Sequence, residues 1–273
     1  MQHARAICRI VLLSTSTAIL YLGWLLTRPL GLVSRDLGRR TQRFVLRTWA
    51  RSCAATVGLR VTLRGRAPEP PFFLVCNHLS YLDVIVLMGV VDGTLLAKAE
   101  IARWPVIGFL ARTSGTLFVE RARRGDLRRV LGEIEAALAD GRGVVVFPEG
   151  TSSAGEGVLP FLPSLFEAPL RARIPVHAAA LTYRTPAGGP PAHQAVCWWG
   201  EMTFCDHLYA LLGHSGLEAG LAFGAEPVAA VDRKGLARAA HGAVESLFTP
   251  VVGRLGRARS GPCHGKESGA CAP

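Results

Sequence analysis

The amino-acid sequence predicts an α/β protein with a largely parallel sheet covered by helices, preceded by an N-terminal helical segment that attaches to a membrane. Two observations lead to this fold class. Apolar strand-like runs alternate with helical runs, and the strand-like runs are apolar on both faces. The 273 residues suffice for one sizeable core and an accessory element. We divide the chain into membrane-attachment helices over residues 1–58, a folded domain over 59–250 and a disordered basic tail over 251–273.

The accessory element is the N-terminal quarter, which carries almost all of the excess basic charge. Of the formal net charge of +11, +10 lies in residues 1–70. Ile10 to Thr27 form a run of 18 uncharged, mostly apolar residues, and the following segment mixes apolar side chains with the arginines Arg35, Arg39, Arg40, Arg43, Arg47 and Arg51. Such a mixture on a helix is typical of binding to an anionic bilayer surface. Nucleic acid is not expected as a partner, because it would leave the apolar run unexplained.

The apolar run is at the short end for a membrane-spanning helix, so the sequence leaves open whether it crosses the bilayer or lies on its surface. A cleaved signal peptide is disfavoured, since no small-x-small cleavage site follows the run. The 7 cysteines include no Cys-x-x-Cys pair, which disfavours a structural zinc site and a disulfide framework. We therefore expect free thiols, no metal site and a reducing compartment.

The folded domain is predicted to alternate between strands and helices after the breaker Pro68 to Pro71. Strands are predicted at residues 72–76, 94–98, 115–119 and 144–147, with further strand-like segments at 174–183, 194–200 and 217–223. Helices are predicted over 84–91, over 127–138 and over a short segment at 207–212. A last helix begins near Asp232, a residue type that caps helices. Residues 254–273 lack an apolar period, which predicts disorder.

Polar clusters follow three of the predicted strands: Asn77-His78, Glu120-Arg121 and Glu149-Gly150-Thr151. The carboxyl ends of parallel strands lie at one edge of a sheet, and active groups gather outside that edge. The three clusters are therefore expected to form one site.

His78 and Asp83 lie at the junction between the first of these strands and the helix after it. An Asp in the first turn of a helix can accept a hydrogen bond from one imidazole nitrogen, which leaves the other nitrogen free as a base. The plainer interpretation is a His that caps a helix beside an unrelated Asp. No Gly-x-Ser-x-Gly motif is present, and Ser80 has no second base beside it. Direct attack by a bound hydroxyl is therefore favoured over a covalent serine intermediate.

The other two clusters favour binding of an anionic or polar group. Gly150 and Thr151 offer backbone N–H groups and a hydroxyl, and Arg121 offers a guanidinium. Taken alone, Glu149-Gly150-Thr151 is equally consistent with a plain turn, and Arg121 is equally consistent with a surface ion pair. Their position beside His78 is what favours a role in binding.

These residues resemble the sequence blocks of a known family. Asn77 to Asp83 resembles its block N-H-x-S-x-x-D, Gly115 to Arg121 resembles G-x-x-F-x-x-R, and Phe147 to Thr151 resembles F-P-E-G-T. Ile174 to Val176 stands where the fourth, proline-containing block belongs. The family is that of the membrane-associated lysophospholipid and glycerolipid acyltransferases, which includes the bacterial 1-acylglycerol-3-phosphate acyltransferases. The blocks occur in the family's order, over roughly residues 70–225.

The resemblance implies that residues 59–250 form an acyltransferase domain. It implies that His78 takes the proton from a lysolipid hydroxyl as that oxygen attacks the thioester of acyl-CoA or acyl carrier protein, while Asp83 holds the imidazole. The polar head of the acceptor would be bound by Arg121, Glu149, Gly150 and Thr151, with Asn77 and Lys98 as further candidates and an electrostatic role for Lys98. No metal, cofactor or covalent intermediate is implied. The enzyme is expected at the membrane, on the cytoplasmic face of the inner membrane.

Two positions depart from the family pattern and bear on the acceptor. Ser152 stands where the phosphate-binding block usually has Arg, and Ala178 stands near the place of a second proline. Loss of that guanidinium weakens the case for an acceptor with a phosphate. Residues 147–166 and the stretch Trp198 to Met202 look more like the subgroup that acylates lyso-ornithine lipid. Because the phosphate acceptor is the commoner one in the family, 1-acylglycerol-3-phosphate is placed first and lyso-ornithine lipid second.

Two functions of other classes remain as alternatives. A lipid esterase, in which His78 activates water, would release free fatty acid without an acceptor. A membrane lipid-binding protein without enzymatic activity would tolerate the loss of His78.

Overall fold

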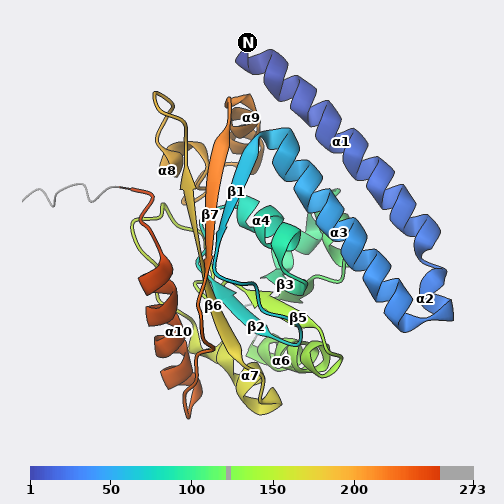
Figure 1. Cartoon of the computed structure of the whole chain (residues 1–273), viewed down its shortest axis with the longest axis vertical. Coiled ribbons are helices and arrows are strands. Elements are labelled where there is room, and N and C mark those ends of the chain that lie inside the picture. Colours follow the sequence, from blue (N-terminus) through green and yellow to red (C-terminus); the bar gives the residue numbers. More distant parts are fainter. Residues whose placement is uncertain (121–123, 253–273) are drawn as a thin grey trace, which may run out of the picture.

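The computed structural model describes residues 1–120 and 124–252, and its central element is a mostly parallel sheet (Figure 1). Within the described residues the sheet has seven strands in the order β1-β7-β6-β2-β5-β3-β4. Their bounds are β1 Leu59–Arg64, β2 Phe73–Cys76, β3 Gly93–Lys98, β4 Leu117–Val119, β5 Gly143–Val146, β6 Val176–Arg184 and β7 Leu217–Phe223. The pair β6 and β7 is antiparallel, whereas the other neighbours are parallel. The predicted fold class is confirmed.

Helices cover both faces of this sheet. Their bounds are α1 Gln2–Thr27, α2 Leu30–Val33, α3 Arg35–Val57, α4 Leu82–Val90, α5 Ile107–Thr113, α6 Arg124–Ala139, α7 Glu167–Ala172, α8 Ala192–Ala195, α9 Phe204–Gly213 and α10 Arg233–Leu247, with short 3-10 turns at Ala99–Arg103 and Pro163–Phe166. The predicted cap of the last helix is confirmed, because the Asp232 carboxylate accepts hydrogen bonds from the N–H groups of Lys234 and Gly235.

The core consists of two apolar layers, one on each face of the sheet. Along β2, Leu74 and Cys76 pack into the layer that contains α4 and α9, while Phe73 and Val75 pack into the layer that contains α6, α7 and α10. Successive side chains of a strand point to opposite faces, so a central strand buried on both faces has to be apolar throughout. This is why the run at 72–76 shows no alternation of apolar and polar residues.

Two of the differences from the sequence-based prediction concern strands. The prediction of a strand at residues 194–200 was wrong. Helix α8 ends at Ala195, and the chain continues without strand structure. Its residues Val196 and Cys197 are fully buried, so the apolar run reflects burial, which periodicity cannot distinguish from a strand. Strand β1 was not predicted. It lies at the edge of the sheet and is exposed after Leu59, so its sequence lacks the apolar signature of a buried strand.

Helices α1 and α3 lie side by side and are joined through α2 (Figure 1). The segment Gln2–Val33 is long and apolar enough to cross a membrane, with a mean hydropathy of 1.8 over its most apolar window and none of that window buried. Yet α1 is hydrogen-bonded to the folded domain. Arg5 donates to the carbonyl of Gly213 at 2.9 Å, and Arg9 donates to the carbonyls of Leu212 and His214 at 3.0 and 2.6 Å. Both arginines thus cap the carboxyl end of α9.

Arginines of α3 cap the carboxyl end of α4 in the same way. Arg47 donates to the carbonyl of Val90 at 3.0 Å, and Arg51 donates to that of Gly89 at 3.2 Å. Arg43 forms an ion pair with Asp92 just beyond the end of α4. The sequence assigned all of these arginines to the bilayer surface, whereas the structure directs three of them toward the carboxyl end of α4. That helix carries Asp83 in its first turn.

Candidate active site

The sequence-predicted site residues meet at the carboxyl ends of β2 and β5, which are neighbours in the sheet. Asn77 and His78 follow β2, Asp83 lies in the first turn of α4, and Glu149 and Gly150 follow β5. Thr151 is exposed beside them, and Lys98 is exposed at the end of β3. Arg121, predicted to belong to the same site, lies outside the described residues.

The His78 imidazole is held by Asp83. Nδ1 of His78 lies 2.7 Å from Oδ2 of Asp83, and an ionised carboxylate can only accept. Nδ1 therefore carries the proton, and Nε2 is left as the basic nitrogen. The imidazole stacks on the Phe147 ring, with centroids 4.2 Å apart and an interplanar angle of 17°. The His78 side chain remains 21% exposed, so a substrate can reach it.

The Asp83 carboxylate is fully buried and fully hydrogen-bonded. Oδ2 also accepts from the N–H groups of Leu79 at 2.7 Å and Ser80 at 3.0 Å, while Oδ1 accepts from the hydroxyl of Tyr183 at 2.7 Å. The amino end of α4 adds a favourable electrostatic field. A buried carboxylate is tolerated only when its lone pairs are satisfied in this way. The negative charge is thus placed beside the imidazole, where it stabilises an imidazolium ion.

Tyr183 is a residue of this site that sequence reasoning missed. It lies on β6 and is fully buried, and both burial and the neighbouring Asp83 raise the pKa of its phenol well above the ordinary value. The phenol therefore stays protonated and donates. A tyrosine in an apolar strand is unremarkable in a sequence, and its 100-residue separation from Asp83 leaves no local signal.

Replacing Tyr183 by phenylalanine should lower the free energy of unfolding by about 2 kcal/mol, because Oδ1 of Asp83 loses a charge-assisted hydrogen bond in the interior. Without the hydrogen bond from the Tyr183 hydroxyl, the Asp83 carboxylate carries more negative charge toward His78 and stabilises the protonated imidazole more strongly. We therefore expect the acidic limb of the pH–rate profile to move to higher pH. Tyr81→Phe is the matched control, since its hydroxyl contacts Nδ1 of His207 at 2.9 Å and not the carboxylate. An unchanged pH profile in Tyr183→Phe would contradict this role.

Asn77 and Glu149 hold the loop that carries His78. The side-chain amide of Asn77 donates to the carbonyl of Leu181 at 2.9 Å and accepts from its N–H at 2.7 Å, which continues the pairing of β2 with β6. Oε1 of Glu149 accepts from the backbone N–H of His78 at 2.8 Å, and Oε2 accepts from that of Leu159 at 3.1 Å. Both carboxylate oxygens of Glu149 are therefore engaged by the backbone.

Burial raises the pKa of Glu149 from 4.5 to about 7, against the opposing effect of its two backbone hydrogen bonds. The folded protein thus binds a proton that the unfolded chain releases between these two pH values. Stability should fall as pH rises through this window, by up to about 1.4 kcal/mol per pH unit. The free energy of unfolding of Glu149→Gln, measured in urea across the window, should lack this slope. Parallel wild-type and variant curves would exclude Glu149 as the titrating group.

Backbone hydrogen bonds join three loops around His78. The N–H of Ser153 donates to the carbonyl of His78 at 3.0 Å, and the N–H of Trp198 donates to that of Leu79 at 2.8 Å. The Ser152 hydroxyl donates to the carbonyl of Trp198. Ser152, noted in the sequence for replacing an arginine, therefore ties the loop after β5 to the loop after α8.

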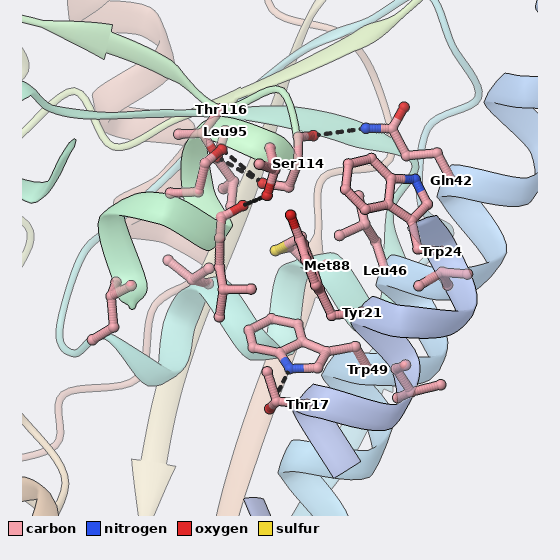
Figure 2. A pocket seen from close by; sticks show the side chains of 17 residues that line it. Thr17, Tyr21, Trp24, Gln42, Leu46, Trp49, Met88, Leu95, Ser114 and Thr116 are labelled. Carbon is pink, nitrogen blue, oxygen red and sulfur yellow. Dashed lines mark hydrogen bonds between the residues drawn. The ribbon is translucent and has the colours of Figure 1, made fainter. Parts of the chain in front are cut away.

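An apolar cavity of about 170 Å³ lies between the N-terminal helices α1 and α3 and the helices α4 and α5 (Figure 2). It is enclosed by residues of α1, α3, α4 and α5 and by neighbouring positions, among them Tyr21, Trp24, Leu46, Trp49, Val84, Met88 and Leu95. Val84 directly follows Asp83 in the chain. Two polar side chains at its wall are paired: Trp49 donates to Thr17 at 3.0 Å, and Gln42 donates to the carbonyl of Ser114 at 3.0 Å. A cavity with so apolar a lining accommodates an apolar chain. Sequence reasoning missed it.

Comparison with known proteins identifies the family. A family model described as Acyltransferase matches residues 58–182. The lyso-ornithine lipid O-acyltransferase of Brucella abortus is 37% identical over 221 residues, which cover 76% of this chain and 82% of that protein. The lyso-ornithine lipid O-acyltransferase of Pseudomonas aeruginosa is 37% identical over 74% of this chain and 78% of its own.

More partial matches are 1-acyl-sn-glycerol-3-phosphate acyltransferases. That of Neisseria gonorrhoeae is 37% identical over 138 residues, which cover 50% of this chain and 53% of that protein. The crystal structure of the 1-acyl-sn-glycerophosphate acyltransferase from Thermotoga maritima has the same fold, with a TM-score of 0.64 at 21% identity over 91% of this chain and 95% of that one. Together with the sequence blocks around His78, the relatives show that this chain belongs to the acyltransferase family and is a lysolipid O-acyltransferase.

Proposed function

We propose that this enzyme transfers a fatty acyl group to the hydroxyl of lyso-ornithine lipid, with His78 as the general base. One observation carries the choice of acceptor: relatives named for this lipid match about three quarters of the chain, whereas the Neisseria relative named for 1-acyl-sn-glycerol-3-phosphate matches half. The comparisons thus favour the acceptor that the sequence placed second. Ser152 supports the same choice, because its hydroxyl is occupied by the Trp198 carbonyl and brings no positive charge for a phosphate.

In the proposed reaction, Nε2 of His78 removes the proton of the acceptor hydroxyl as its oxygen bonds to the thioester carbon. The carbon–sulfur bond then breaks, and the imidazolium returns its proton to the leaving thiolate of CoA or acyl carrier protein. Asp83 stabilises the imidazolium between these two transfers. General base catalysis of this kind contributes about 10²–10⁴-fold to the rate. The acyl chain of the donor would lie in the apolar cavity between α1, α3, α4 and α5.

For binding of the acceptor's polar head we retain Arg121 and Thr151 as proposed contacts, whereas the N–H of Gly150 donates to the carbonyl of Phe147 at 3.1 Å and Gly150 would act by shaping the loop. Glu149 would contribute to this binding indirectly, by holding the loop that carries His78, since its two oxygens accept from the backbone of His78 and Leu159. Lys98, exposed at the end of β3, would contribute only a long-range positive potential.

We further propose that α1 lies in the surface of the bilayer and does not cross it. Its carboxyl-terminal half packs on α3, where Trp49 of α3 donates to Thr17, and Arg5 and Arg9 tie its start to α9. A crossing α1 would draw α3 and its six arginines into the hydrocarbon, where each charge is costly. Exposed apolar residues suit insertion into one leaflet: Ile7, Val11, Ile19, Leu22, Leu26, Leu32, Val33, Phe44 and Phe109.

Epitope tags at the two ends of the chain test this arrangement. Both tags should be reached from the cytoplasmic side of the inner membrane and neither from the other side. Tags on opposite sides would mean that α1 crosses the membrane, and two tags on the outer side would overturn the proposed location.

The acceptor is tested by acyl transfer with purified protein in detergent. Labelled acyl-CoA or acyl carrier protein is offered with lyso-ornithine lipid and with lysophosphatidic acid, separately and in competition. We expect product on lyso-ornithine lipid at a much higher kcat/KM. Product on lysophosphatidic acid alone would mean that 1-acylglycerol-3-phosphate is the acceptor. Release of free fatty acid without transfer to either lipid would indicate an esterase.

A further inference from the structure

A second cleft, polar and of about 510 Å³, lies at the tip of the hairpin that α1, α2 and α3 form. Its wall includes Arg28, Arg35 and Arg39, and its far side includes Asp140. Asp140 lies between the end of α6 and the start of β5 at Gly143, so this cleft lies at the amino ends of the parallel strands. His78 lies at their carboxyl ends. The cleft is therefore separate from the active site.

The wall of the cleft carries excess positive charge. Arg39 is paired, with Nη1 3.2 Å from Oδ1 of Asp140. The Arg28 guanidinium lies over the Trp24 ring, 5.2 Å from its centroid, which orients the group while its N–H donors remain in the plane. Across the described parts of the chain, no carboxylate lies within ion-pairing distance of Arg28 or Arg35. Two guanidinium groups are thus available in one concave site, the arrangement that binds phosphate oxygens.

Exposed apolar side chains beside the cleft indicate that the phosphate belongs to a membrane lipid. Leu26, Leu32 and Val33 at the same tip are 82%, 91% and 83% exposed. Apolar side chains that point outward beside arginines are typical of an element whose tip enters the hydrocarbon while its charges stay at the level of the headgroups. A soluble phosphate compound or a nucleic acid would leave these apolar residues in water.

Two glycines shape the cleft. Gly31 of α2 and Gly38 of α3 both line it, and a Cβ atom on Gly38 would lie 2.7 Å from the Cα atom of Gly31. Their close contact fixes how α2 folds back on α3 and so sets the spacing between Arg28, before α2, and Arg35, after it. The cleft also shares Trp24 and Gln42 with the apolar cavity, so its occupant lies next to that cavity.

We propose that this cleft binds the phosphate headgroup of an anionic phospholipid of the host membrane, at a site distinct from the one that binds the acceptor. Arg28 and Arg35 make charge-assisted hydrogen bonds to the phosphate oxygens, and the exposed residues at the tip enter the adjacent hydrocarbon. The site thereby selects anionic membranes and sets the orientation of the hairpin in them. This inference goes beyond acyl transfer and does not depend on the identity of the acceptor.

The test is sedimentation of the full chain with vesicles of phosphatidylcholine alone and of phosphatidylcholine with phosphatidylglycerol. The cleft variant is Arg28→Gln with Arg35→Gln. The control variant is Arg40→Gln with Arg103→Gln, which removes the same charge from two exposed arginines that do not line the cleft. The preference for phosphatidylglycerol is the ratio of binding to the two kinds of vesicle. We expect this ratio to fall at least about ten-fold further in the cleft variant than in the control, because one charge-assisted hydrogen bond to phosphate contributes about that much.

Equal losses in the two double variants would overturn the proposal, because they would show a general attraction of basic charge and no headgroup site. Soluble glycerol 3-phosphate should not displace the protein from the vesicles, and displacement at low concentration would mean that the cleft binds a soluble phosphate compound. Absence of binding to any vesicle would refute membrane attachment itself, whereas binding without headgroup preference refutes only the site. Thermal unfolding of both variants checks that they are folded.

Discussion

Replacement of His78 by alanine is expected to lower acyl transfer by about 10³-fold, within the range that a positioned general base contributes. The fold should persist, because the contacts of this loop with Glu149 and Ser153 use the backbone N–H and C=O of residue 78 and survive the substitution. The measurement is transfer from labelled acyl donor at saturating lysolipid, with vesicle binding measured on the same preparation.

His3→Ala serves as the control, since His3 is an exposed residue of α1 that contacts Tyr209, far along the chain from His78. It should transfer at the wild-type rate. A His78→Ala protein with turnover within a few-fold of wild type would refute the role of His78 as the base.

Replacement of Asp83 by asparagine is expected to reduce kcat by at least about 10²-fold while leaving the protein folded. The amide fits the existing hydrogen bonds, because its oxygen can accept from the N–H groups of Leu79 and Ser80 and its NH₂ group can donate to the Tyr183 hydroxyl. What is lost is the negative charge that stabilises the imidazolium of His78. Stability should change by only about 1 kcal/mol.

Asp83→Ala provides the contrast. It leaves the buried N–H groups of Leu79 and Ser80 and the hydroxyl of Tyr183 without an acceptor, at a cost of about 1–3 kcal/mol for each group. We expect this variant to express poorly or unfold at a much lower temperature. If Asp83→Asn kept nearly full activity, the charge would not act on His78, and the carboxylate would be a structural element alone.

Parts of this site could be predicted because they are local in the chain. Strand β2, the loop after it and the first turn of α4 are contiguous, and the partner of His78 lies five residues away. A buried strand has to be apolar, and a helix that follows a turn accepts an Asp in its first turn. Backbone preference and apolar pattern therefore suffice to bring His78 and Asp83 together.

Other parts depend on contacts between distant segments. Tyr183 reaches Asp83 from β6 only because β2 and β6 are neighbours in the sheet. Glu149 was predicted to bind substrate from its motif, and the fold adds that each of its oxygens accepts from a backbone donor. A carboxyl group at a strand end suits either role, and its contacts with the backbone of His78 and Leu159 depend on how the two loops meet in the fold.

The N-terminal quarter shows the same division. Its apolar and basic composition predicts a membrane partner, since buried apolar area and the attraction of arginines to anionic lipids both favour binding to a bilayer surface. Composition does not reveal which face of a helix meets lipid. In the fold, Tyr21 and Trp24 of α1 line a cavity, and Arg47 and Arg51 of α3 cap α4.

The sequence by itself determined the α/β class, the order of most strands and helices, the His78–Asp83 pair and the acyltransferase family. These follow from the periodicity of apolar residues and from motifs in which neighbouring residues act together. Only the tertiary structure decided the buried support of Asp83, the engagement of Glu149, the apolar cavity and the arginine cleft. Each of these joins residues from segments far apart in the chain, and their meeting depends on the packing of the whole fold.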